Sequence, residues 1–190
     1  AVGNTILWSA GAGGTLTLAG DLAAIADGTT LDVSSAAAAV TIAGSPNAMA
    51  LAGAVTFKNT LTTQNWNISA VLSGAGSMTK TGAGKLKLTG VNTYAGGTSI
   101  NAGTLAVNAD AALGAGALTF NGGTLQASAA LASARAVTLG DGGGTIDAAG
   151  LSSAFSGVVS GAGALSVADS VGGGTITLSG ANTYTGGTAV

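Results

Sequence analysis

The chain has 190 residues, and its composition is unlike that of an ordinary globular domain. Only 6% of the residues are charged, against about 25% in typical domains, and 34 are glycine. The net charge of −2 provides no basic surface for nucleic acid and no polybasic segment for an anionic membrane. The chain has no cysteine and no histidine, which excludes a disulfide scaffold and thiolate metal sites. No apolar run approaches the roughly 18 residues that a membrane helix needs, so we expect no membrane insertion by this segment.

The N-terminal third contains short runs in which polar and apolar residues alternate. These runs cover residues 15–18, 30–33, 40–42 and 55–58, and glycines separate them. A period of two is typical of strands with one buried face, so we expect a strand at each run. Residues 21–26, and Leu113 with its flanking alanines, have the composition of a helical turn, but we interpret both as loops.

The middle of the chain contains a segment that returns near its end. Residues 82–107 read as a strand, a corner at 92–97 rich in glycine, and two further alternating runs, and residues 172–190 repeat much of this text. Upstream, residues 71–76 are matched by 158–163. We therefore place two repeat copies at 71–107 and 158–190, and such a repeat decides which architecture is tested first.

The apolar residues from Leu86 onward recur at a regular step. Leu105, Leu125, Ile146 and Leu165 follow it, each about 20 residues after the one before. Hairpins would need strands about 8 to 12 residues apart, whereas a step of about 20 with glycine corners is typical of a coil stacked on a coil. We expect an all-β fold, a single-stranded parallel β-helix of roughly nine coils that covers residues 1–190 as a single unit.

The alternation also predicts which side chains face the interior of that helix. The inward residues are expected to be Leu86, Leu88, Leu105, Val107, Leu118, Phe120, Leu125, Val137, Leu139, Ile146, Leu165, Val167, Ile176 and Leu178. Trp8 and Trp66 are expected to be core or capping residues.

The repeated text resembles a known family. Residues 82–98 read Gly-Ala-Gly-Lys-Leu-Lys-Leu-Thr-Gly-Val-Asn-Thr-Tyr-Ala-Gly-Gly-Thr, which is similar to the autotransporter-associated β-strand repeat of bacterial autotransporter passenger domains. The second copy matches the same pattern but stops before the Ala-Gly-Thr-Leu of the first. The resemblance implies a right-handed β-helix that is exported through an outer-membrane barrel to the Gram-negative cell surface or is secreted. We also expect the segment to be a fragment of a longer passenger.

The repeat corners provide the candidate binding residues. Asn92 with Tyr94, and Asn182 with Tyr184, could form exposed loops that bind sugars, since a tyrosine ring offers a flat face to a sugar. The alternative, which we favour, is that the asparagines and glycines set turn conformations while each tyrosine covers a coil corner.

Other chemistry is weakly represented. Arg135, Asp141 and Asp147 fall within about one coil, and a polysaccharide lyase on a β-helix would need such a cluster, but no histidine or glutamate is present to act as a base. Residues 140–147 faintly resemble one calcium-binding nonapeptide, and such sites need tandem copies. Outward threonines suggest an ice-binding face, which Lys, Asn and Ala interrupt. We expect no enzyme, no metal and no cofactor.

The sequence therefore favours a structural stalk segment of a surface-exposed or secreted autotransporter passenger. We expect it to be adhesive or self-associating, and to contact host or neighbouring-cell surface glycans or proteins. Stacking of each new coil on the last would assist export, because burial opposes backsliding. The alternatives that remain are a β-helical polysaccharide-active enzyme and an ice- or surface-binding β-solenoid.

Overall fold

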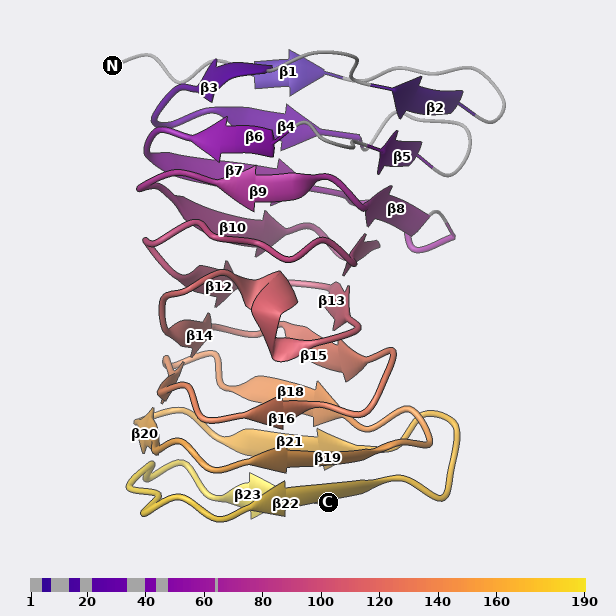
Figure 1. The fold of residues 1–190 in the computed structure, drawn as a ribbon. Coiled ribbons are helices and arrows are strands. Elements are labelled where there is room, and N and C mark those ends of the chain that lie inside the picture. The colour runs from indigo at the N-terminus through magenta and orange to yellow at the C-terminus, as the bar shows by residue number, and fades with distance from the viewer. Residues whose placement is uncertain (1–4, 8–13, 18–21, 34–39, 44–47, 64) are drawn as a thin grey trace.

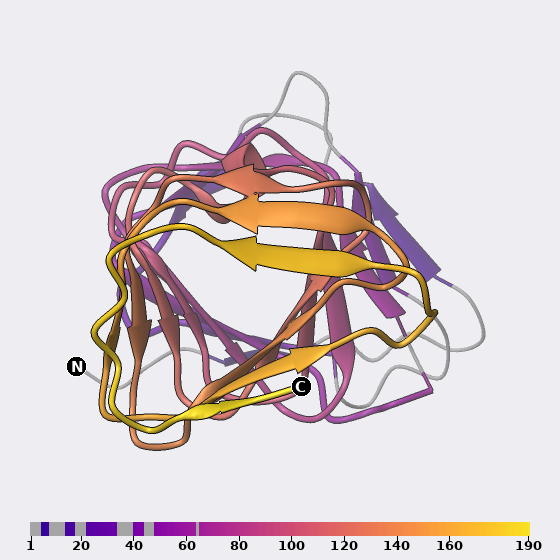
Figure 2. The same ribbon diagram turned by 90° about the horizontal axis from the view of Figure 1, so that it is seen from below.

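The fold was taken from a computed structural model, which describes residues 5–7, 14–17, 22–33, 40–43, 48–63 and 65–190. Within them the chain forms a parallel β-solenoid whose coils stack along one axis (Figure 1). Viewed along that axis, the coils have a three-sided cross-section, and the chain turns anticlockwise as it approaches the viewer at the C-terminal end (Figure 2). The winding is right-handed, and the expected fold class is confirmed.

Two long parallel sheets form two of the sides. Face A is the eight-stranded sheet β1 (Thr5–Leu7), β4 (Thr30–Asp32), β7 (Ala54–Lys58), β10 (Ser77–Thr81), β12 (Thr98–Ile100), β14 (Leu118–Phe120), β17 (Val137–Leu139) and β20 (Val159–Gly161). Face B is the nine-stranded sheet β2 (Gly14–Thr17), β5 (Val40–Ala43), β8 (Asn65–Ile68), β11 (Lys85–Leu88), β13 (Thr104–Val107), β15 (Thr124–Ala127), β18 (Gly144–Asp147), β21 (Leu165–Ala168) and β23 (Thr188–Ala189).

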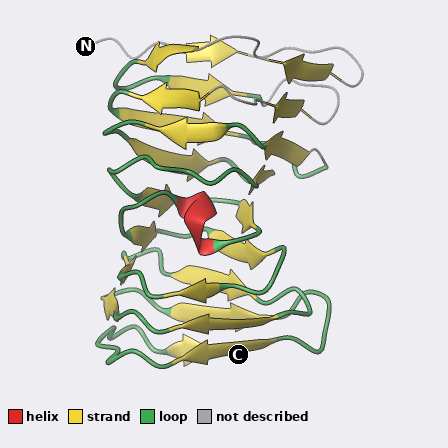
Figure 3. Ribbon diagram, in the orientation of Figure 1, coloured by secondary structure: helices red, strands yellow, loops and turns green. Residues whose placement is uncertain are grey.

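The third side, face C, is interrupted in its middle. It consists of two three-stranded sheets, β3 (Leu22–Ile25), β6 (Ala48–Leu51) and β9 (Val71–Ser73), then β16 (Ala132–Ser133), β19 (Ser152–Phe155) and β22 (Thr175–Leu178). Between them the chain crosses face C twice without a strand, once through residues 89–97 and once through the 3-10 helix η1 (Asp110–Leu113). Figure 3 shows η1 as the one described helix, at mid-height of the solenoid. No described helix is long and apolar enough to cross a membrane.

The length of the coils varies along the axis. Successive outward residues of face A pair as Thr30 with Thr56 and Thr79 with Ser99, which are 26 and 20 positions apart. The step of about 20 therefore holds for the middle of the chain, whereas the N-terminal coils are longer. The expectation of roughly nine coils was slightly high for this reason.

The interior is the apolar column that the alternation predicts. Eleven of the expected inward residues are buried, namely Leu86, Leu88, Leu105, Val107, Leu118, Phe120, Leu125, Val137, Leu139, Ile146 and Leu165. The other three, Val167, Ile176 and Leu178, pack against this core but are only partly buried, because they lie in the last described coils. Trp66 is buried against the ring of Phe57, with centroids 5.4 Å apart, as expected of a core residue. Trp8 lies outside the described residues.

Two local expectations were wrong. The alanine-rich segment around Leu113 was interpreted as a loop but forms η1, and residues 21–26 contain strand β3. In both places stacking on a neighbouring coil decides the conformation. β3 pairs with β6, while η1 is held by long-range contacts from Arg135.

The repeat corners and candidate sites

The first repeat corner fixes one coil to its two neighbours through Asn92. Its side-chain oxygen accepts a hydrogen bond from the Leu72 amide in the coil before, at 2.8 Å, and its side-chain nitrogen donates to the Ala112 carbonyl in the coil after, at 2.6 Å. Asn92 is 5% exposed. An amide side chain supplies one acceptor and one donor from the same group, which suits a position between two coils that each present one backbone group.

Tyr94 of the same corner lies wholly inside the solenoid. Its hydroxyl lies 2.5 Å from the Thr98 hydroxyl, and Thr98 donates to the Leu113 carbonyl at 2.9 Å. Because the single Thr98 proton is used on that carbonyl, Tyr94 donates to Thr98 and makes only a weaker contact with Met78 Sδ at 3.6 Å. Burial raises the pKa of Tyr94 to about 12, against the smaller lowering effects of the Thr98 hydrogen bond and the Arg135 charge. The phenol therefore stays protonated and keeps its donor role.

The expected exposed sugar platform is therefore corrected for the first copy. Asn92 and Tyr94 are both buried, and their polar atoms are used between coils, so neither offers a face to a ligand. The favoured alternative, a structural corner, describes them. The signal that could have indicated this is the Tyr-x-x-x-Thr spacing, since both copies contain it.

The second copy repeats the geometry on a more open part of the solenoid. Asn182 accepts from the Val159 amide at 2.9 Å, and the hydroxyls of Tyr184 and Thr188 lie 2.5 Å apart. Asn182 and Tyr184 are half-buried. Their role as ligand-binding residues stays a prediction.

The two copies lie on different faces of the solenoid. In the first copy β11 lies on face B, the corner crosses face C, and β12 lies on face A. In the second copy β22 lies on face C, the corner follows face A, and β23 lies on face B. The copies are thus four coils and one face apart. The motif depends on contacts between successive coils, and no particular side of the solenoid is required.

The acidic and basic residues that resembled a lyase cluster are not brought together. Arg135 pairs with Asp110, at 2.8 Å from its Nε, and its other nitrogens donate to carbonyls of the η1 segment, including Gly114 at 3.0 Å. Burial by itself raises the pKa of Asp110, and the hydrogen bonds from Arg135 and Ser133 with the Arg135 charge outweigh it, so the pKa is lowered. Arg135 is a structural clamp on η1.

Asp147 is likewise engaged by its own chain. Its carboxylate accepts from Gln126 at 2.7 Å, from the Ser170 hydroxyl at 2.7 Å, and from the amides of Ala149 and Ser170. Burial raises its pKa, but these hydrogen bonds outweigh that effect and the net shift is downward. Lys85 donates to the other end of Gln126, so face B carries a polar ladder, Lys85–Gln126–Asp147–Ser170, whose groups satisfy one another.

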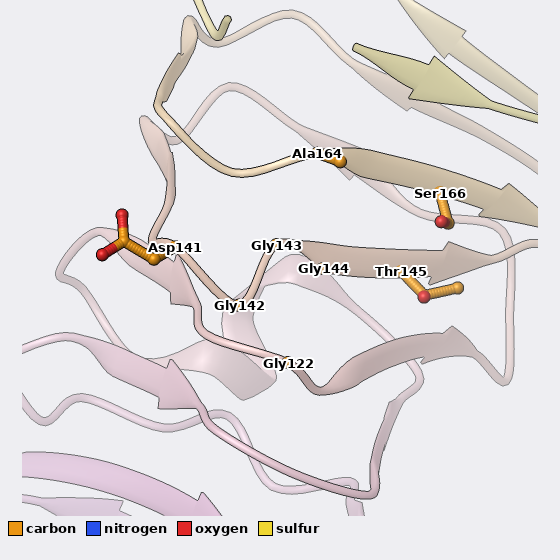
Figure 4. Close-up of a pocket in the computed structure, with 8 residues that line it drawn as sticks. All are labelled: Gly122, Asp141, Gly142, Gly143, Gly144, Thr145, Ala164 and Ser166. Atoms are coloured by element: carbon orange, nitrogen blue, oxygen red, sulfur yellow. The ribbon is translucent and has the colours of Figure 1, made fainter. Parts of the chain in front are cut away.

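The third member of the expected cluster, Asp141, lies at a glycine corner. It borders a shallow recess of about 160 Å³ together with Gly142, Thr145 and Ser166. Figure 4 shows the Asp141 carboxylate pointing away from the recess, while Thr145 and Ser166 lie on the adjoining strands. Among the described residues no group of three metal-ligating side chains occurs, so the faint nonapeptide pattern does not gather a set of carboxylates here.

Sequence reasoning missed several buried polar residues, and the largest of them is Lys80. It lies at an inward position of β10, and its ammonium donates to the carbonyls of Thr81 and Gly82 at 2.7 Å and of Ala102 at 3.3 Å. Burial lowers its pKa from 10.5 to about 8. The alternation of β10 does place position 80 inward. A lysine at such a position nevertheless suggests an exposed site, because its three carbonyl partners cannot be recognised from the sequence.

Comparison with known proteins agrees with this geometry. The family model of the passenger-associated-transport-repeat matches residues 78–107 and 171–190, which contain the two corners. The adhesin BmaC autotransporter of Brucella suis biovar 1 (strain 1330) is 37% identical over 125 residues, which are 65% of this chain. The chain therefore carries two passenger-associated transport repeats and is similar to a segment of an autotransporter. No solved structure matches it.

The chain spans about 4% of the length of that curated relative. The relative therefore supports the type of the segment, while the activity and partners of a whole passenger are a separate question. The two matches bear out the expected location on the Gram-negative cell surface or in the secreted fraction.

Proposed function

We propose that the passenger segment is a rigid, non-enzymatic stalk, one continuous β-helical unit whose lateral faces adhere to other surfaces or to one another. The observation that carries the proposal is the unbroken in-register stacking of faces A and B. Parallel strands joined in this way satisfy their backbone groups along the whole axis, and only side chains remain available for recognition. The matching relative is named an adhesin, which supports an adhesive role.

The non-enzymatic part of the proposal rests on how the charged groups are used. Asp110 and Arg135 clamp η1, Asp147 accepts four hydrogen bonds, and Lys80 holds a corner. A hydrolase or lyase needs a base and a charge stabiliser that can reach a substrate. Residues engaged in this way do not provide that pair.

The same stacking supports a contribution to export. Each completed coil offers a strand edge and apolar side chains such as Leu105 and Leu125 to the coil that follows. Burial of each new coil lowers the free energy of the exported chain and opposes its return.

The adhesive role can be tested with inert beads coated with the chain. We expect coated beads to cluster with one another or to attach to host-cell layers or bacterial cell layers more than beads coated with an unrelated protein do. Beads coated with a Leu125→Asp variant, in which the core is disrupted, should lose this gain. Coated beads that neither attach nor cluster above background would refute the proposal, as would release of sugar from any polysaccharide by the folded chain.

A further inference from the structure

Face A carries an unbroken column of hydroxyl side chains, one on each coil. The strand registers align Thr56, Thr79, Ser99, Thr119, Thr138 and Ser160 in a single line. None of these side chains is buried. Neighbouring strands lie about 4.8 Å apart, so the column is roughly 24 Å long. The lysine and asparagine interruptions that argued against a regular threonine face belong to β8 and β11 of face B.

A second polar column runs beside the first. Thr81, Asn101 and Asn121 lie two positions further along three successive coils, and their alignment is fixed by backbone hydrogen bonds from Asn101 to Lys80 and from Asn121 to Ile100, both 3.0 Å. The outward positions of β10, β12, β14, β17 and β20 include no charged residue. From β10 to β20, face A is therefore a neutral, hydroxyl-rich strip, and the Asp32–Lys58 ion pair of β4 and β7 lies outside it.

The hydroxyls of this strip are hardly used within the protein. Within the described part of the chain, the side chains of Thr79, Ser99, Thr119 and Thr138 make no hydrogen bond to protein, and the Ser160 hydroxyl makes one long contact of 3.5 Å. On face B, by comparison, the Lys85–Gln126–Asp147–Ser170 ladder satisfies itself. Face B also has four aligned hydroxyls, Thr104, Thr124, Thr145 and Ser166, but the charged Lys85 is in register with them and Asp147 lies beside them. For an uncharged partner, face A therefore offers the longer hydroxyl column and the one without charges.

The chemistry of the strip restricts what it would bind. Each hydroxyl exchanges a hydrogen bond with water for one with a ligand, which gives little net free energy, so a small ligand is held weakly. A ligand that repeats along the column gains from many such contacts at once. No charge on the strip attracts an ionic polymer. An extended, uncharged polysaccharide presents hydroxyl and ring oxygens that repeat along its length, as the hydroxyls of the column repeat from coil to coil.

We propose that face A between β10 and β20 binds extended, uncharged polysaccharide chains lengthwise. The proposal rests on the adhesive function above and names the partner class and the face. Affinity should grow with chain length, because a longer polysaccharide contacts more coils at once. It should also be nearly independent of salt, since screening acts on charges.

The test is retention of the full chain by insoluble polysaccharides. The probes are cellulose as the uncharged polymer and cross-linked pectate as the anionic one, each at low and high salt. We expect retention by cellulose that changes less than twofold with salt, and weak retention by pectate. Long soluble β-linked glucan oligosaccharides should compete with cellulose, and glucose should not.

A pair of double variants locates the binding face. Thr119→Val with Thr138→Val removes two hydroxyls of face A at nearly constant shape, and should reduce binding to cellulose roughly tenfold. Thr104→Val with Thr124→Val makes the same change on two neighbouring coils of face B, and should change binding less than twofold. Both replacements suit strands, so circular dichroism and thermal unfolding should match those of the unmodified chain.

Three results would overturn the proposal. They are equal loss in the two double variants, retention that disappears at high salt, and no retention by cellulose from a chain whose coated beads still attach to cells. In the last case the adhesive function stands and only the partner class fails, whereas beads that do not attach remove the adhesive function itself. Inhibition of ice recrystallisation without retention by cellulose would assign the column to ordered water instead, and would also refute the proposal.

Discussion

The two repeat corners allow the structural role of the asparagine to be measured against an internal control. Asn92→Ala removes the acceptor of the Leu72 amide and the donor to the Ala112 carbonyl, both between buried coils. A buried backbone group left unsatisfied costs about 1 to 3 kcal/mol, so the variant should lose about 2 to 5 kcal/mol of local stability. Asn182→Ala removes one hydrogen bond, to the Val159 amide, at a half-buried site where water can replace it. Its cost should be below about 1 kcal/mol.

Hydrogen exchange of the Leu72 and Val159 amides, which donate to Asn92 and Asn182, measures these costs locally. A single unfolding midpoint is less suitable, because repeat proteins lose cooperativity between neighbouring units. In Asn92→Ala the Leu72 amide should exchange at least about 30-fold faster than in the unmodified chain. In Asn182→Ala the Val159 amide should accelerate less than about fivefold. Equal acceleration at the two sites, or less than about threefold at Leu72, would refute the reasoning that burial decides the role of the corner.

Three further outcomes follow from the same contacts. Leu105→Asp places a charge in the core, so it should lower the free energy of unfolding by more than about 4 kcal/mol and abolish protease resistance around β13. Lys85→Ala should lower it by less than about 1 kcal/mol. Similar digestion of the two variants would contradict the inward position of Leu105. Burial lowers the Lys80 pKa to about 8, so between about pH 8 and 10.5 the unfolded chain binds this proton more tightly than the folded chain does. The free energy of unfolding should therefore rise with pH in that window by about 1 to 2 kcal/mol after allowance for solvent screening. Urea titrations should show this rise for the unmodified chain and not for Lys80→Met. Arg135→Leu leaves the Asp110 carboxylate and the η1 carbonyls without their donor, and amide exchange across η1 should accelerate while β20 is unchanged; uniform acceleration would show that Arg135 does not act locally.

Much of the architecture could be predicted from local pattern. The two-residue alternation placed Leu86, Leu105 and Leu125 correctly, and their step of about 20 residues distinguished stacked coils from hairpins. These features repeat along the chain, and each is determined by a few neighbouring residues, so they can be recognised in the sequence. The longer N-terminal coils were not predicted, because the register of a coil is set by the coil that it stacks on.

The hydrogen bonds of the repeat corners could not be predicted from local pattern, because the groups that their side chains bind lie one coil away. Nothing near Asn92 in the sequence indicates that its side chain joins the Leu72 amide to the Ala112 carbonyl. The same is true of Lys80, whose buried ammonium is satisfied partly by Ala102 in the next coil. Residue types that are usually exposed are buried here, because the stacked corners supply backbone groups to satisfy them.

The register between coils is the central claim, and an engineered disulfide tests it most directly. The chain has no cysteine of its own, so a double variant introduces a single possible pair. Thr119→Cys with Thr138→Cys joins register partners about 4.8 Å apart, within the Cα range that a disulfide accepts. Thr119→Cys with Ser160→Cys joins positions two coils apart, roughly 10 Å, which is beyond that range. The account predicts rapid intramolecular oxidation of the first pair in dilute solution and none of the second, and closure of the two pairs at similar rates would contradict it.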